Sequence, residues 1–217
     1  MAKKSKHSIE EKVEDWCKRQ LSATRYYTKT EEINSEIGNA LRKAPSKKGG
    51  EGRNFPDIQC LIETPQMERI PVMIEVKGCK GDLIKTNDKE EILNFNAKGD
   101  PLYSNIAGYA VNGAVHYAKA ILDYTESYDK VIAIGVNGFY RPDNTIRYEI
   151  GAYYISKNNL FIPKKIAEYD DLSFLFPENL GQLLDKIANL SLTEEEIEAK
   201  KLQLEDDIER KLKEINQ

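Results

Sequence analysis

The feature that most constrains the fold of this chain is a pair of strand-like segments, residues 58–63 and 70–77, joined by a short polar connection. The connection contains Pro65, which cannot donate a backbone hydrogen bond to a ladder and therefore favours a turn. In a strand, alternate side chains point to opposite faces, so Ile74 and Val76 share one face while Glu75 and Lys77 share the other. The segments together predict a hairpin with one apolar face and one polar face.

The register of this hairpin predicts that two acidic residues meet. The midpoint of positions 57 and 75 is 66, the centre of the expected turn, so symmetric pairing places Asp57 opposite Glu75. Directly opposed residues have Cβ atoms about 5 Å apart, and two carboxylates at that distance repel each other unless a positive charge separates them. Mg²⁺ prefers such oxygen ligands, and the Lys77 ammonium on the same face could orient a water or stabilise charge on a phosphate. Metal, water and cation together are what hydrolysis of a phosphodiester requires.

The rest of the chain predicts a mixed α/β fold. Apolar residues at helical spacing indicate helices over residues 8–21, 30–44, 104–124 and 193–217, and a capping box is expected at Ser8 and Glu11. Strands are expected over residues 131–136 and 145–155, with Asn137-Gly138 as a turn signal. Residues 78–101 are expected to form a surface excursion, and no internal repeat is expected. The order of elements predicts an α/β domain, a mixed sheet flanked by helices, with a C-terminal helical extension.

Charge and composition exclude some function classes. The 217 residues carry a net charge of −4, which argues against a domain that holds nucleic acid by bulk charge alone. Residues 1–50 are nevertheless basic, with 12 Lys/Arg against 7 Asp/Glu. No apolar run is long enough to cross a bilayer, so no membrane partner is expected. Three cysteines are an odd number within or beside predicted helices and strands, which makes a disulfide framework unlikely and a reducing cytoplasm the default location.

Pro56-Asp57 followed by Glu75-Val76-Lys77 resembles the motif of the PD-(D/E)XK nuclease superfamily. The glycine-rich stretch before Pro56, the helix over residues 109–119 and the strand over residues 131–136 are similar to the N-terminal nuclease domain of restriction-modification proteins. The similar proteins are the type I motor subunit and the fused type IIG or type I-like enzymes. The resemblance covers roughly residues 30–155 and implies a restriction-endonuclease-like sheet.

The resemblance also implies roles for individual residues. Asp57 and Glu75 would bind Mg²⁺, for which Mn²⁺ can substitute, together with the backbone carbonyl of Val76. Lys77 would be the catalytic lysine. An acidic residue on the preceding helix would assist, with Glu36 as the candidate and Glu32 as the alternative.

The implied substrate is duplex DNA, cut by a restriction endonuclease. Residues 1–165 would form the nuclease domain and residues 166–217 a helical connector toward a methyltransferase or specificity domain or subunit. A homodimer is compatible with this organisation. Type I nuclease domains carry a glutamine and a tyrosine on the helix after the motif; here that helix offers Asn112, His116 and Tyr117, whose roles stay open.

Simpler interpretations stand beside these. Lys47, Lys48, Arg53 and Lys80 could contact DNA phosphates or could belong to solvated loops. Asp57, Glu75 and Lys77 could form a solvated sheet face with one Glu–Lys pair. The main alternative function is a catalytically inactive, nuclease-like DNA-binding or assembly module, and a repair or recombination nuclease is a third hypothesis.

Overall fold

The computed structural model describes residues 8–51, 55–190 and 193–215. The helices are α1 (Ile9–Gln20), α2 (Ser35–Lys43), α3 (Tyr103–Gly108), α4 (Ala110–Tyr124), α5 (Leu180–Ala188) and α6 (Glu194–Ile215). The strands are β1 (Tyr26–Thr28), β2 (Ile58–Glu63), β3 (Arg69–Lys77), β4 (Lys130–Tyr140), β5 (Ile146–Ser156) and β6 (Lys164–Tyr169). Among the described helices, none is both long and apolar enough to span a membrane.

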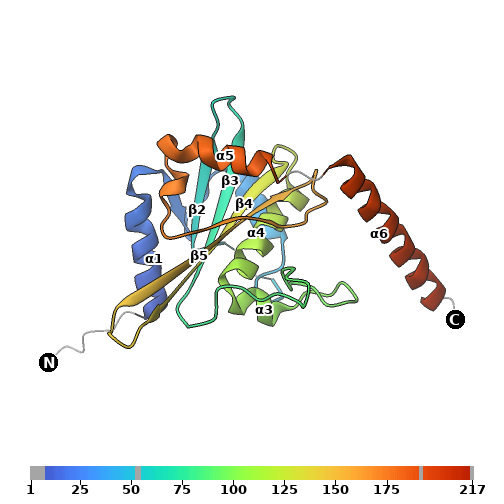
Figure 1. Ribbon diagram of the computed structural model, residues 1–217, viewed down its shortest axis with the longest axis horizontal. Helices are drawn as coiled ribbons and strands as arrows, with labels where there is room; N and C mark the ends of the chain where they lie inside the picture. Colours follow the sequence, from blue (N-terminus) through green and yellow to red (C-terminus); the bar gives the residue numbers. More distant parts are fainter. Residues whose placement is uncertain (1–7, 52–54, 191–192, 216–217) are drawn as a thin grey trace.

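The six strands form one mixed sheet in the order β1-β2-β3-β4-β5-β6, which confirms the predicted α/β class. Only the central β3–β4 pair is parallel, while its neighbours are antiparallel. The connection that makes this pair parallel runs through the excursion, α3 and α4, and Figure 1 shows α4 lying across the sheet. Because parallel strands end at the same edge, the carboxyl ends of β3 and β4 lie together.

Two hydrophobic layers cover the two faces of the sheet. One layer joins α1 and α5 to alternate residues of the strands, among them Ile74, Val76 and Val136. The other joins α2 and α4 to the opposite face, which includes Met73 and Ala133. This division confirms the predicted alternation in β3, and it leaves Glu75 on the face that α4 covers.

The helix predictions were right in type but not in every boundary. The capping box between Ser8 and Glu11 is confirmed. The helix expected from residue 30 begins only at Ser35, where the Asn34 side chain accepts a hydrogen bond from the Ile37 N–H. The helix expected over residues 104–124 is divided at Tyr109, whose backbone is extended. The division lets the first N–H groups of α4 donate to the carbonyls of Asp82 and Leu83.

The turn predicted at Asn137-Gly138 was wrong, because both residues lie inside β4. The chain turns instead at Arg141–Asn144, where the Asn144 N–H donates to the Arg141 carbonyl and Asn144 has a φ of 64°. Gly138 serves packing: a Cβ there would lie 2.4 Å from Cγ2 of Val13 on α1. The glycine therefore allows α1 to approach β4 closely.

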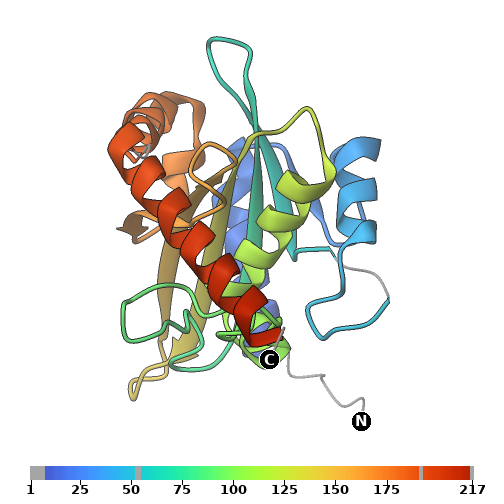
Figure 2. The ribbon, with the colours of Figure 1, turned by 90° about the vertical axis from the view of Figure 1, so that its right-hand side faces the viewer.

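The excursion contains a repeat that the sequence reasoning did not predict. Its two tight turns are nine residues apart, and each begins with an asparagine whose N–H donates to the carbonyl four residues later. In each turn the side-chain oxygen of the asparagine, Asn87 or Asn96, accepts hydrogen bonds from the backbone N–H groups two and four residues later. Figure 2 shows the excursion at the end of the sheet where the N-terminal helix begins.

Candidate active site

The predicted acid pair lies at the carboxyl end of β3. In the β2–β3 hairpin Ile58 pairs with Ile74, so the register confirms the predicted alignment and brings Asp57, just before β2, opposite Glu75. The Asp57 Oδ2 accepts a hydrogen bond from the Val76 N–H at 3.0 Å, which ties the start of one strand to the end of the other.

Glu75 is fully buried beneath α4. A Cβ at Gly113 of α4 would lie 3.0 Å from the Glu75 Cγ, so the glycine leaves room for this side chain. The Glu75 Oε1 accepts hydrogen bonds from Lys77 Nζ at 2.9 Å and from Lys47 Nζ. The Glu75 Oε2 is buried and has no hydrogen-bond partner among the described residues. One carboxylate oxygen is therefore neutralised by two ammonium groups while the other is left open.

Asp57 has an unusually high affinity for a proton. Burial, and secondly the negative charge of Glu75, raise its pKa from 3.8 to about 7, although the Val76 N–H and the cations of Lys47 and Lys29 oppose the shift. The Lys29 Nζ lies 3.8 Å from Asp57 Oδ1. The pKa is raised chiefly because burial disfavours the charged form of the Asp57 carboxyl.

Lys77 lies at the centre of the cluster. Its Nζ donates to Glu75 Oε1 and, at 3.2 Å, to the Val76 carbonyl, and it lies 4.0 Å from Glu10 Oε1. Glu10 belongs to the first turn of α1. The sequence reasoning missed it, because no periodicity links α1 to the end of β3. The close approach depends on Gly78, since a Cβ there would lie 2.7 Å from the Glu10 backbone nitrogen.

The structure does not bring Glu36 to this cluster. Its Oε1 accepts hydrogen bonds from the N–H groups of Glu126 and Ser127, in the loop that precedes β4. Since the acid pair lies where β3 ends and β4 is parallel to β3, the loop before β4 lies at the opposite edge of the sheet. Glu32 forms an ion pair with Arg42 instead. The acid that a helix supplies is Glu10, from α1 rather than α2.

The four candidate DNA-binding residues have different surroundings. Lys47 is engaged with Glu75, and although burial lowers the pKa of its ammonium, the adjacent Glu75 carboxylate raises that pKa above the usual value. Lys48 and Lys80 are exposed and stay predicted DNA contacts. Arg53 lies outside the described residues.

The helix residues whose roles were open hold the loops beside the cluster. Asn112 binds the excursion through two hydrogen bonds to the backbone of Lys85: its Oδ1 accepts from the N–H at 2.8 Å, and its Nδ2 donates to the carbonyl at 3.0 Å. The His116 Nε2 is 2.8 Å from the Pro45 carbonyl. Burial lowers the pKa of His116, so its ring is neutral at pH 7 and Nε2–H is the donor to Pro45. Tyr117 is buried in the core.

Asn137 is a further residue that the sequence reasoning missed. It is fully buried and pairs with Lys77 in the parallel ladder. Neither its side-chain nitrogen nor its oxygen has a hydrogen-bond partner among the described residues. Buried amides are nearly always paired, because a buried amide without partners lowers the stability of the folded protein. An asparagine within an otherwise apolar strand was the available signal, but with the following glycine it was interpreted as a turn.

The cluster has the donor set of a divalent cation site. Across the described residues, no group of three or more His, Cys, Asp and Glu side chains is placed to hold a metal ion. The donors present are two carboxylates and the Val76 carbonyl, a small set that suits Mg²⁺, which keeps several water ligands. The Glu75 Oε2 has no partner among the described residues, and burial together with the charge of Glu75 raises the pKa of Asp57, so an added cation would stabilise both ionised carboxylates.

Comparison with known proteins adds one similarity. No family model matches the chain, and no solved structure matches it. The chain is 36% identical over 183 residues to a protein of Heyndrickxia coagulans named "Type II restriction enzyme and methyltransferase RM.BcgI". The matched region is 84% of this chain and 24% of that protein, so the chain spans about a quarter of the length of the relative it resembles.

Proposed function

We propose that this chain is the nuclease region of a restriction-modification protein and that it hydrolyses phosphodiester bonds of duplex DNA with Mg²⁺, for which Mn²⁺ can substitute. The similarity to a restriction enzyme and methyltransferase supports the restriction role. The observation that carries the chemistry is the buried Glu75 carboxylate, with one oxygen unpartnered among the described residues, opposite an Asp57 of raised pKa. This pattern of residues supports membership of the PD-(D/E)XK superfamily.

Each residue of the cluster has a role in this proposal. Asp57, Glu75 and the Val76 carbonyl would hold the cation, which supplies charge stabilisation for the phosphate when it is bound. The Lys77 ammonium has three N–H groups and donates two of them, to Glu75 and Val76, so one remains to orient a water or a phosphate oxygen. Lys47 neutralises Glu75 in the free protein and could contact a phosphate when released.

The test is nicking of supercoiled plasmid by the purified protein with Mg²⁺, Mn²⁺ or EDTA. We expect cation-dependent nicking that falls at least about 100-fold in Asp57→Asn and Lys77→Ala, the order of effect of removing one charge-stabilising group. Glu36→Gln is the matched carboxylate control and should nick like the unmodified protein. Equal background from all four proteins in every condition would refute the nuclease proposal.

One observation favours the alternative of an inactive DNA-binding or assembly module. Lys47 already neutralises the Glu75 carboxylate without any metal ion, and a lysine in that place can be a permanent substitute for a cation. Under this alternative, the protein would retard DNA in a gel with no nicking in either cation. Lys47→Ala would then not change the result, whereas in an active nuclease it should alter the dependence on Mg²⁺.

A methyltransferase or specificity domain or subunit is the partner we propose, because the name of the relative joins restriction and methyltransferase activities. The α6 helix presents exposed apolar side chains, Leu204, Ile208, Leu212 and Ile215, on a highly charged background. Such a seam is typical of a helix that contacts another surface. We propose the connector role for α6 alone, because β6 pairs with β5 in the sheet and α5 packs on the core, so the expected boundary at residue 166 lies too early in the chain.

A further inference from the structure

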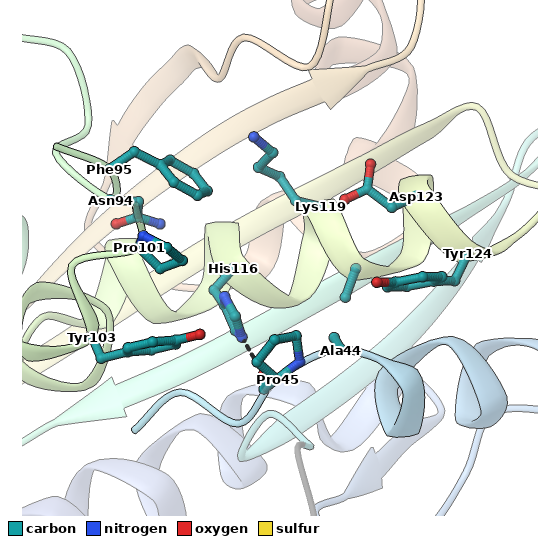
Figure 3. Close-up of a pocket in the computed structure, with 11 residues that line it drawn as sticks. Ala44, Pro45, Asn94, Phe95, Pro101, Tyr103, His116, Lys119, Asp123 and Tyr124 are labelled. Atoms are coloured by element: carbon teal, nitrogen blue, oxygen red, sulfur yellow. Dashed lines mark hydrogen bonds between the residues drawn. The ribbon is translucent and has the colours of Figure 1, made fainter. Parts of the chain in front are cut away.

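A cavity of about 340 Å³ lies on α4 between two segments that flank the acid pair. Figure 3 shows α4 as its floor, with Pro45 along one side and Phe95 and Pro101, from the excursion, on the other. The hydrogen bond between His116 and the Pro45 carbonyl, drawn as a dashed line, fixes the first side to the helix. The volume lies in the usual range for pockets that take small organic groups.

The walls of the cavity are rich in aromatic rings. Phe95 and Tyr124 stand toward opposite ends of the pocket in Figure 3, and they are 39% and 45% exposed. Tyr103 is supported from behind by Gly49, where a Cβ would lie 3.1 Å from the Tyr103 ring. Gly49 also has a φ of 82°, a backbone conformation that residues with a side chain rarely adopt, so both the close contact and the backbone disfavour a side chain there. The glycine therefore leaves room for the Tyr103 ring in the wall of the cavity.

A hydrogen-bond donor, Lys119, and a hydrogen-bond acceptor, Asp123, also line the cavity. Lys119 and Asp123 are one turn apart on α4, and neither makes a hydrogen bond or ion pair with another residue that the structure describes. The Lys119 Nζ lies 4.6 Å from the centroid of the Phe95 ring. Every nucleobase offers a flat π face together with hydrogen-bonding groups along its edge. The cavity has complementary groups for both.

Two segments of the chain connect the lining of the cavity with the acid pair. Pro45 lines it two residues before Lys47, which bonds to Glu75. Gly113, which contacts Glu75, and His116, which lines the cavity, lie within one turn of α4, a pitch of about 5.4 Å. Bases in one strand of a duplex are about 3.4 Å apart along the axis. One turn of α4 is thus comparable in length with the spacing of one or two nucleotides.

We propose that this cavity binds one unpaired nucleobase of the DNA strand that the acid pair holds. The inference rests on the proposed function, which makes DNA the ligand and the acid pair the place where a phosphate of that strand binds. Taking a base out of the stack has a cost, which contact with the aromatic wall formed by Phe95, Tyr103 and Tyr124 offsets. The cavity would therefore select strands that are locally open next to the bond to be cut.

The test compares two single-stranded probes of equal charge by fluorescence anisotropy in EDTA. One is an eight-nucleotide oligothymidylate, and the other is an eight-unit abasic strand with the same phosphates. We expect the unmodified protein to bind the thymidylate about 5- to 150-fold more tightly, the equivalent of 1–3 kcal/mol for one stacked base. Phe95→Ala and Tyr124→Ala should bring this ratio toward one, while Phe95→Trp should retain it.

Leu204→Ala is the control, because it removes a similarly exposed apolar side chain from α6 and should leave the ratio unchanged. Equal affinity of the unmodified protein for both probes would overturn the proposal, and so would discrimination that persists in both alanine variants. Circular dichroism and thermal melting confirm that each variant is folded. Because no cation is present, a protein unable to nick plasmid can still pass this test, and a protein that nicks can still fail it.

Discussion

Replacing Asp57 by asparagine should make the folded protein more stable at pH 8. Burial and the neighbouring Glu75 raise the pKa of Asp57 to about 7, against 3.8 for the ordinary carboxyl. The folded protein therefore binds this proton more tightly than the unfolded chain does. The resulting stability is fully present below about pH 4 and is lost as the pH rises through about 7.

The size of the effect follows from the two pKa values. A rise from 3.8 to about 7 corresponds to about 4 kcal/mol, at roughly 1.4 kcal/mol for each tenfold change in proton affinity. Roughly 2–3 kcal/mol of this falls between pH 5 and pH 8. Asparagine is uncharged and its oxygen can still accept the Val76 N–H, so Asp57→Asn should remove this loss while keeping the contact.

The assay is urea unfolding in EDTA at pH 5 and pH 8. From pH 5 to pH 8 the free energy of unfolding of the unmodified protein should fall by roughly 2–3 kcal/mol more than that of Asp57→Asn. Asp123→Asn, which removes an exposed carboxyl, should behave like the unmodified protein. Parallel pH dependence in the unmodified protein and Asp57→Asn would show that Asp57 does not titrate as the structure indicates.

The same pair of proteins tests the cation. At pH 8 a cation that binds only the folded state stabilises it by about 2.7 kcal/mol at 100 times its dissociation constant. Mg²⁺ should therefore raise the urea midpoint of the unmodified protein and leave that of Asp57→Asn nearly unchanged. An equal rise in both would place the cation elsewhere.

Four further substitutions probe the surroundings. Asn137→Leu should raise the free energy of unfolding by about 1–3 kcal/mol, because it removes a buried amide without partners in the described chain; a loss in urea unfolding would show that the amide is satisfied. Gly78→Ala should lower stability by about 1–3 kcal/mol by forcing α1 away from β3. Gly181→Ala, with open space around it, should be neutral or stabilising, and similar melting temperatures for the two alanine variants would contradict this account. Glu36→Gln should lower the free energy of unfolding by about 0.5–1.5 kcal/mol, because its hydrogen bonds to the loop before β4 are weaker. Its nicking rate should stay within about twofold of that of the unmodified protein, and a tenfold loss would show that Glu36 acts in the active site.

The acid pair was predictable because it depends on local pairing. A hairpin with a short turn has its register set by the turn, so counting outward from Gln66 was enough to oppose Asp57 and Glu75. The alternation within β3 placed Glu75 on the face opposite Ile74 and Val76 in the same way, although that face is also covered, by α2 and α4. Both inferences use only residues within one supersecondary unit.

The remaining site residues depend on contacts between distant parts of the chain. Glu10 reaches Lys77 only because α1 packs on β3 and β4, and Asn137 lies beside Lys77 only because β4 is parallel to β3. Neither packing arrangement has a periodic signal in the sequence. Glu36 is the opposite case: it was predicted for the site but lies elsewhere. An acidic residue on a nearby helix is the right kind of residue, but the sequence does not say which edge of the sheet that helix approaches.

The single parallel pairing in the sheet also bears on how the chain folds. Ile58 and Ile74 are 16 positions apart, whereas Val72 and Ile132 are 60 apart. Each doubling of a closed loop adds about 0.6 kcal/mol of entropy cost, so the hairpin closes more readily than β4 docks. The two carboxylates therefore meet first while hydrated, where their repulsion is only about 1 kcal/mol at 4 Å. The carboxylates lose their water only when α4 and β4 dock later. The free energy of this desolvation should therefore slow the step that completes the sheet.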